Sequence, residues 1–377
     1  MKKLKQIFGQ IHLWLGLVSG LVVVVVSLTG CLYVFEEEAR DIFQHKYFYV
    51  ENPVGVRKNL VEISKAVKDA FPNEKITQIR FKSNENSAFL YHTKSDKAIS
   101  INPYTLQIQG VRYLEADFFG FILDIHLHLM MDEIGEQIIK WNVLIFFVLC
   151  LSGLILWIPK QKKFLKKALT IKWKTQNWKR LNWDLHSVLG FYGLFVLIII
   201  SLTGIFWVFD LAKSLVSKVT GEAITNTKAP KNISTDSIKA FSMESAYYLA
   251  KQRYAGESQT FISNAEKKDQ PIRVLFRYPY SIVRKQNTLF FDKFSGELLR
   301  EDLYKNYNNY DKVMRSNYDL HTGRIPILGI GSKVIYFLAS LFATTLPISG
   351  FLIWLNKRKR KPSKSSKAFN AESLLTN

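Results

Sequence analysis

The chain has 377 residues, 48% of them hydrophobic, and a formal net charge of +21. Its apolar residues gather in four blocks that are almost free of charge, which excludes an ordinary soluble two-domain protein. The blocks are Leu13 to Phe35, Val143 to Ile158, Val188 to Phe209 and Val334 to Leu355. Three of them reach the roughly 20 residues that an α-helix needs to cross about 30 Å of hydrocarbon, and the second is shorter. We therefore predict four transmembrane helices in a lipid bilayer.

The positive charge is concentrated near the ends of these helices. Lys2, Lys3 and Lys5 precede the first block, nine lysines or arginines lie between 160 and 180, and seven lie between 357 and 367. All three segments flank the predicted helices on the same side, so the positive-inside rule places both termini and the central loop in the cytoplasm. Clusters this close to helix ends are explained by topology, and we do not expect nucleic acid to be a partner.

The two long segments between the helices, 36–120 and 210–318, are predicted to lie outside the cytoplasm. The first begins with a helical stretch, NLVEISKAVKDAF, followed by the alternating strands ITQIRF, SAFLYH and AISINP and a closing strand in YTLQIQGVRY. The second has a helix in SMESAYYLAKQRY, strands in PIRVLFRYPY and TLFFD, and a turn and final strand in FSGELLRE. Each segment is predicted to be a small α+β module. Neither contains a cysteine that could form a disulfide.

The apolar helices are repeated within the chain. HLWLGLVSGLVVVVVSLTG begins at His12, and HSVLGFYGLFVLIIISLTG begins at His186. LSGLILWI at 151–158 likewise matches ISGFLIWL at 348–355. The fold predicted is a four-helix transmembrane bundle made of two parallel repeats, with two external modules. In chain order the parts are 1–35 (helix), 36–120 (module), 121–159 (histidine segment and helix), 160–184 (basic loop), 185–209 (helix), 210–318 (module), 319–356 (histidine segment and helix) and 357–377 (tail).

The stretch LTGC, which ends at Cys31, resembles a bacterial lipoprotein cleavage signal. SLTG recurs at 201–204, where Ile205 follows it. The tetrapeptide therefore fits the repeated helix better than a processing site. Cleavage at Cys31 stays an alternative, and it would remove His12.

Two pairs of histidines follow the repeat. His12 corresponds to His186 on the cytoplasmic side, and His126 in LDIH corresponds to His321 in YDLH on the external side. A single histidine near a helix end is usually a capping or interfacial residue. Pairing at two depths instead indicates axial ligands of haem iron, which facing helices of a bundle can supply.

The spacing of small residues supports this interpretation and leaves one ligand open. Glycines and serines lie on the helix face below His12 and His186, and Gly30 lies five turns beyond His12 on that face, about 27 Å away. Such a face could seat two cofactors, although small residues also serve close helix packing. His128 competes with His126 as the outer ligand. The remaining histidines, His45 and His92, have no counterpart and are expected to be exposed.

The sequence resembles a known protein family. The paired HxxLG helices, LDIHLHLMMDEIG and DLHTGRIP are similar to the PepSY-associated transmembrane proteins of bacterial inner membranes, a group that includes ferric-siderophore reductases. The resemblance covers about residues 5 to 360. It implies b-type haem, two copies here, held by His12, His126, His186 and His321. It also implies electron transfer from a cytoplasmic or quinol donor to a periplasmic ferric-siderophore or other ferric chelate.

Two other classes of function stay open. The external modules could bind a partner, with the helices acting only as anchors, although a pure anchor would not need four histidines in register. The parallel repeat could form a transport pathway, but helices one and three lack the charged or broken segments that substrate sites favour. No nucleotide-binding glycine motif, iron-sulfur cysteine cluster or HExxH motif is present, so the electron donor must be separate.

Overall fold

The computed structural model describes residues 2–114, 116–225, 228–234, 241–264, 267 and 269–358. Of the predicted cytoplasmic tail, residues 359–377 lie outside this part of the chain. Contacts divide the described residues into two compact units, which are treated separately: those within 2–31, 125–205 and 334–358 form the first, and those within 32–124 and 206–333 form the second.

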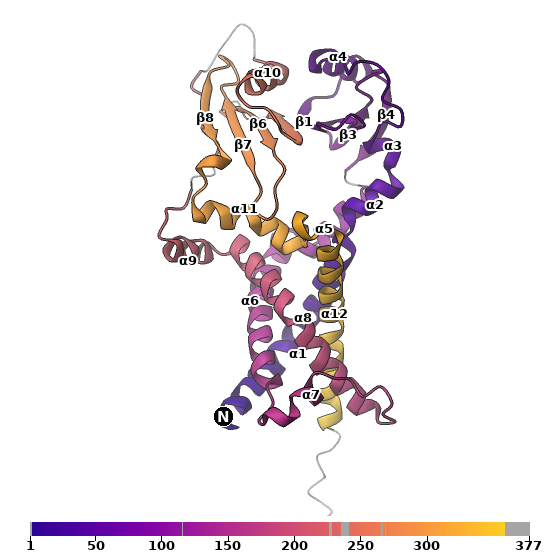
Figure 1. Cartoon of the computed structure of the whole chain (residues 1–377), viewed down its shortest axis with the longest axis vertical. Coiled ribbons are helices and arrows are strands. Elements are labelled where there is room, and N and C mark those ends of the chain that lie inside the picture. The colour runs from indigo at the N-terminus through magenta and orange to yellow at the C-terminus, as the bar shows by residue number, and fades with distance from the viewer. Residues whose placement is uncertain are drawn as a thin grey trace, which may run out of the picture. The chain divides into compact units, whose positions relative to one another are not determined.

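The first unit contains four helices long and apolar enough to cross a membrane, as the sequence predicts. They are α1 (Lys2–Tyr33), α6 (Asp132–Trp157), α8 (Trp178–Val208) and α12 (Ile330–Arg358). Figure 1 shows the four helices running alongside one another. A helix satisfies all its backbone hydrogen bonds internally, which is why apolar stretches of this length fold this way in hydrocarbon.

Shorter helices connect or cover these elements. They are α2 (Glu36–Phe43), α3 (His45–Phe48), α4 (Leu60–Ala70), α5 (Phe118–His128), α7 (Leu165–Ala168), α9 (Asp210–Thr220), α10 (Met243–Arg253) and α11 (Asn309–Thr322), with 3-10 turns at Lys162–Phe164, Tyr304–Asn306 and Pro326–Leu328. The N-cap of α4 is Asn59 and that of α10 is Ser242; each side chain accepts a hydrogen bond from the third backbone N–H beyond it. Both caps lie where the sequence predicts a helix to begin.

The second unit contains one antiparallel sheet of eight strands. The strands are β1 (Ile76–Lys82), β2 (Phe89–Thr93), β3 (Lys97–Ile101), β4 (Ile108–Tyr113), β5 (Gln259–Asn264), β6 (Ile272–Arg277), β7 (Gln286–Phe291) and β8 (Leu298–Asp302). Their order across the sheet is β4-β3-β2-β1-β5-β6-β7-β8. Each half of the chain thus supplies one helix followed by four strands, and the two halves meet where β1 pairs with β5.

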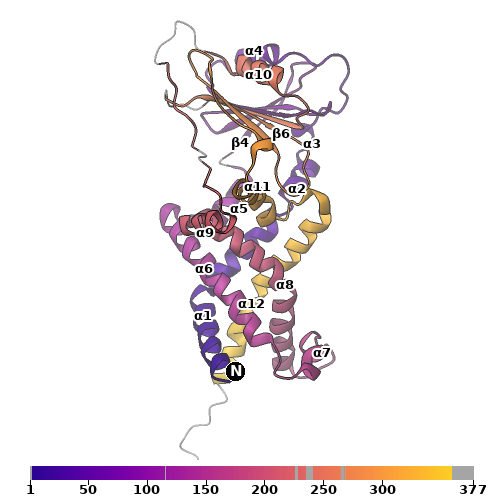
Figure 2. The same cartoon turned by 60° about the vertical axis from the view of Figure 1, so that its left-hand side comes forward.

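One face of this sheet is covered by α4 and α10, as Figure 2 shows. Ile63 and Val67 of α4 and Ala246 and Ala250 of α10 are fully buried against it, together with alternate residues of the strands. Side chains alternate between the two faces of a strand, so the intervening residues project to the opposite face. That face is only partly apolar, with Tyr47 of α3 packed on Leu90 and Ala98.

Two features differ from the sequence prediction. The strand β5 was not predicted; it joins the two predicted modules into one sheet through five pairs, from Gln78 with Ser263 to Lys82 with Gln259. The helix α6 was predicted to begin near residue 143 but begins at Asp132. Acidic side chains in its first turn favour this start, because they offset the positive end of the helix dipole.

Candidate functional site

The first pair of predicted ligands meets inside the helical unit. His12 projects from α1 and His186 from α8, and the centroids of their rings lie 6.3 Å apart with the ring planes at 89°. The sequence predicts this pairing only through the repeat. The packing of α1 beside α8 is what brings the two rings together.

Each ring is oriented by a serine of another helix. Nδ1 of His12 lies 2.9 Å from Oγ of Ser152 in α6, and Nδ1 of His186 lies 2.9 Å from Oγ of Ser349 in α12. The Ser152 hydroxyl donates its single hydrogen to the carbonyl of Leu149 at 3.1 Å. Ser349 donates in the same way to carbonyls of its own helix.

These contacts favour one tautomer of both histidines. A serine hydroxyl has one hydrogen to donate, so an oxygen whose hydrogen is engaged must accept from the ring. We therefore assign the ring hydrogen to Nδ1 of His12 and of His186. The lone pair is then on Nε2, which is the state that ligates a metal, and an Nδ1–H bond of this kind is the usual outer support of a metal-bound histidine.

The spacing of the rings fits two axial ligands of one iron. An imidazole nitrogen lies about 1 Å from its ring centre and binds a metal at about 2.0–2.1 Å, so two ligands on opposite sides of a metal place their ring centres about 6 Å apart. The observed 6.3 Å agrees with that value. Among the described residues, no group of three or more His, Cys, Asp or Glu side chains is placed to hold a metal ion.

Glycines allow the rings to approach the neighbouring helices. A Cβ at Gly153 would lie 3.4 Å from Cε1 of His12, and one at Gly350 would lie 3.2 Å from Cε1 of His186. Of the small residues on the helix face below His12, Gly16 faces Leu149 across a helix contact, and Gly20 faces Pro347.

His126, the predicted external ligand of the first repeat, lies near the end of α5. Its Nδ1 is 3.0 Å from Oγ1 of Thr29 in α1, and its Cε1 is 3.6 Å from the Cβ position of Gly30. Thr29 donates to the carbonyls of Val25 and Val26, so its oxygen is an acceptor for the ring, as in the first pair. The turn after α5 is left-handed at Leu129 and Met130, with φ of 51° and 58°.

His321, the external ligand predicted in the second repeat, lies in the last turn of α11. Its ring is 4.9 Å from that of Trp207. Asp319, two residues earlier, is buried and accepts hydrogen bonds from Arg284 at 2.5 and 3.1 Å. The acidic residue of the predicted YDLH motif therefore anchors the helix that carries His321.

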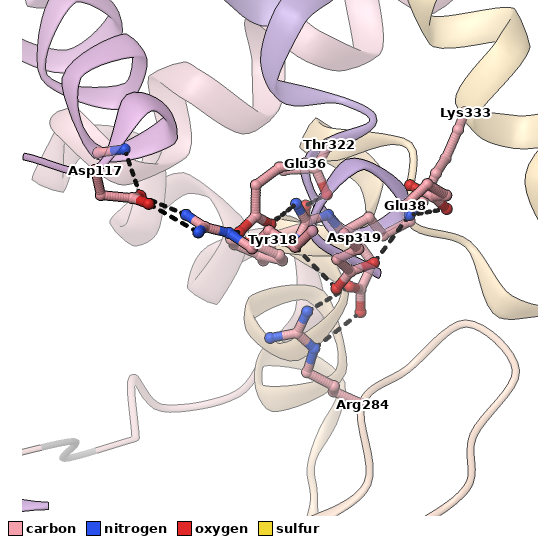
Figure 3. Close-up of polar contacts among 12 residues, drawn as sticks. Glu36, Glu38, Asp117, Arg284, Tyr318, Asp319, Thr322 and Lys333 are labelled. Carbon is pink, nitrogen blue, oxygen red and sulfur yellow. Dashed lines mark hydrogen bonds and ion pairs between the residues drawn. The ribbon is translucent and has the colours of Figure 1, made fainter. Parts of the chain in front are cut away.

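Further ion pairs hold the segments around α11, as Figure 3 shows. Arg324 binds Glu36 at 3.0 Å and Glu37 at 3.1 Å, and Lys333 binds Glu37 at 2.8 Å and Glu38 at 2.7 Å. Burial acts to raise the pKa of Glu37, but the charges of Arg324 and Lys333 outweigh it and lower that pKa below its usual value. The network ties the start of α2 to the residues that follow α11.

The other predicted histidine positions have mixed outcomes. His45 is exposed, as expected, and stacks on Tyr49 with ring centroids 4.8 Å apart. His92 was expected to be exposed but is half-buried in β2, because the strand lies inside the sheet and not at its edge. His128 ends α5 and is also half-buried.

Sequence reasoning missed the groups that orient the rings. Ser152, Gly153, Ser349 and Gly350 lie in the matched stretches LSGLILWI and ISGFLIWL, which were recognised as a repeat without a role for the Ser-Gly pair. The recurrence of that dipeptide was the available signal. Thr29 lies in the repeated SLTG in the same way.

The fold and this site define a membrane-embedded, mostly helical protein that carries an antiparallel sheet and a pair of facing histidines. A family model described as the PepSY-associated TM region matches residues 10–357, nearly the whole chain. The chain belongs to this family. Among curated proteins, none matches it.

Proposed function

We propose that the protein is a haem-containing reductase of the bacterial inner membrane that passes electrons to a periplasmic ferric chelate, such as a ferric-siderophore. The observation that supports the proposal is the pair His12 and His186, whose ring centroids lie 6.3 Å apart and whose Nδ1 atoms each lie 2.9 Å from a serine hydroxyl. Four helices contribute to this arrangement, because α6 and α12 supply the two serines.

In this proposal, His12 and His186 hold an inner b-type haem, and His126 and His321 hold an outer one. A bound haem supplies one-electron chemistry at an iron whose potential is tuned by its ligands and their hydrogen bonds. The chain's own part is to fix the imidazoles. Ser152, Ser349 and Thr29 accept the Nδ1 hydrogens, which keeps Nε2 available and makes each ring a more basic ligand.

The proposed topology places both termini and the basic loop at 160–184 in the cytoplasm. The nine basic residues between 160 and 180 support it through the positive-inside rule. Under this topology the sheet lies in the periplasm and the histidines at the start of α1 and α8 lie toward the electron donor. The recurrence of one helix and four strands, each following a long apolar helix, supports a duplicated origin of the chain.

The experiment that tests the proposal is an absorption spectrum of the detergent-purified chain from haem-replete cells, first oxidised by air and then reduced. A Soret band with sharp α and β bands on reduction is expected for iron with two histidine ligands. Adding ferric chelate to the reduced protein should return the oxidised spectrum. A colourless protein would refute the proposal and favour a membrane-anchored binding or regulatory protein without redox activity.

A further inference from the structure

The sheet has a second face that the proposed electron path does not explain. Paired strands place the side chains of each cross-strand pair on the same face. One row crosses all eight strands on the face opposite α4 and α10, and it consists of Arg112, Ala98, His92, Gln78, Ser263, Arg273, Phe290 and Arg300. Arg80 lies on the same face in the adjoining row, and Arg277 in the row beyond that one.

This face carries more arginines than carboxylates to pair with them. Arg112 is paired with Asp117 at 2.5 Å, and Arg300 with Asp302 at 3.0 Å. Among the described residues, Arg80 and Arg273 have no carboxylate within ion-pair distance.

Other cations lie near the unpaired arginines. Burial lowers the pKa of Arg80; the nearby charge of Glu36 raises it, and the charges of Arg112 and Arg40 lower it. Desolvation and the nearby charge of Arg315 both lower the pKa of Arg273. Arg273 therefore lies near another cation without a carboxylate partner, and an anion would relieve that repulsion.

A cavity of about 570 Å³ opens on this face where the two halves of the sheet meet. Its polar lining includes Gln78, His92, Asp96, Ser263, Asn264 and Arg273. Burial and the charges of Arg80 and Arg112 lower the pKa of His92 to about 4, so this ring is neutral near pH 7 and can either donate or accept. A volume of this size is within the usual range of small-molecule sites, about 300–1,000 Å³.

The cavity offers both donors and acceptors to a ligand. Arg273 supplies a guanidinium suited to a carboxylate, and the Gln78 amide is held in place by its bond to Ser263 at 3.2 Å. Asp96 supplies an acceptor. A ligand that fits must therefore carry negative oxygens and also hydrogen donors.

We propose that this cavity binds a carboxylate chelate of a trivalent metal ion, with its carboxylates on Arg273 and its metal-bound water toward Asp96. The inference rests on the proposed function in one respect: it names the class of ferric chelate that the reductase takes. A neutral chelate lacks the group that Arg273 requires.

The experiment measures binding of gallium(III) citrate to the detergent-purified full-length chain by isothermal titration calorimetry. Gallium(III) resembles iron(III) in size and charge but is not reduced, so the readout is independent of haem and of electron transfer. Arg273→Gln should weaken binding about 10-fold to 100-fold, because it removes a charge-assisted hydrogen bond. Arg273→Lys should retain part of the affinity, because it keeps the charge but not the planar fork.

The matched control is Lys68→Gln, which removes one positive charge from the exposed surface of α4 on the other side of the sheet. It should bind as the unchanged protein does, and an uncharged gallium hydroxamate chelate should bind at least tenfold more weakly than the citrate complex. Equal binding by Arg273→Gln and the unchanged protein would overturn the inference. The inference would also be overturned if Arg273→Gln lost affinity for phosphatidylglycerol vesicles but kept its binding of gallium citrate. That result would assign the arginines to a lipid headgroup.

The two proposals can fail separately. Arginine-dependent binding of gallium citrate to a protein that contains no haem would refute the reductase and leave the anion site standing. Reduction of ferric citrate at the same rate and KM by Arg273→Gln would refute the anion site and leave the reductase standing.

Discussion

Removing the serine hydroxyls is the sharpest test of the histidine pair. In Ser152→Ala, the Nδ1 hydrogen of His12 loses the acceptor that lies 2.9 Å away. Leaving a buried donor unpaired costs about 1–3 kcal/mol. The carbonyl of Leu149, which the serine no longer occupies, remains within hydrogen-bonding reach of the ring and offsets part of this cost. We therefore expect a loss near the lower end, about tenfold in haem affinity.

The assay is titration of haem into the haem-depleted protein, followed by redox titration of the Soret band. Ser349→Ala should behave like Ser152→Ala, because His186 makes the equivalent contact with Ser349 at 2.9 Å and has the carbonyl of Leu346 within reach. Both variants should also raise the midpoint potential, since a less basic imidazole stabilises ferric iron less. Ser201→Ala is the matched control, because Ser201 is a buried serine of α8 that donates to the Ile198 carbonyl.

Unchanged haem affinity and potential in both serine variants would refute the reasoning that the serines hold the ligating tautomer. An equal loss of haem affinity in Ser201→Ala would show that the weaker binding comes from a general loosening of the helix packing. Ser152→Thr offers a check in the other direction, because it retains a hydroxyl and should retain most of the affinity.

Three further predictions follow from the same geometry. His12→Ala should abolish the low-spin spectrum of the inner haem, while His126→Ala leaves it intact. His128→Ala should change haem content least, and a loss of haem in that variant alone would reassign the outer ligand. Asp117 has a pKa of about 2 in the folded protein, because Arg40 and Arg112 outweigh the effect of its burial. The stabilisation that its carboxylate provides is therefore present at neutral pH and is lost as the pH falls from about 4 to 2. Acid unfolding of Asp117→Asn should be less steep in that range. A reporter fused after Lys166 should signal cytoplasm, and an external signal would invert the proposed topology.

The four long helices could be predicted from the sequence because their folding depends on local composition. An apolar stretch in hydrocarbon has no alternative to a helix, so length and the absence of charge are sufficient. The strands β1 and β6 alternate apolar and polar residues and were predicted for the same reason. β5 was missed because four of the six residues of QTFISN are polar, although Thr260 and Ile262 are fully buried.

The pairing of His12 with His186 was predicted from the repeat, but the contact itself depends on how α1 packs against α8. The recurring Ser-Gly dipeptide marks Ser152 and Ser349, but it does not show which side chain each hydroxyl contacts, because that contact is made with a ring on another helix. The sequence by itself determined the helices, their repeat and the residue types at the site. Only the tertiary structure decided which rings meet, which hydroxyls orient them and that β1 and β5 join two modules into one sheet, because those contacts connect residues more than 100 positions apart.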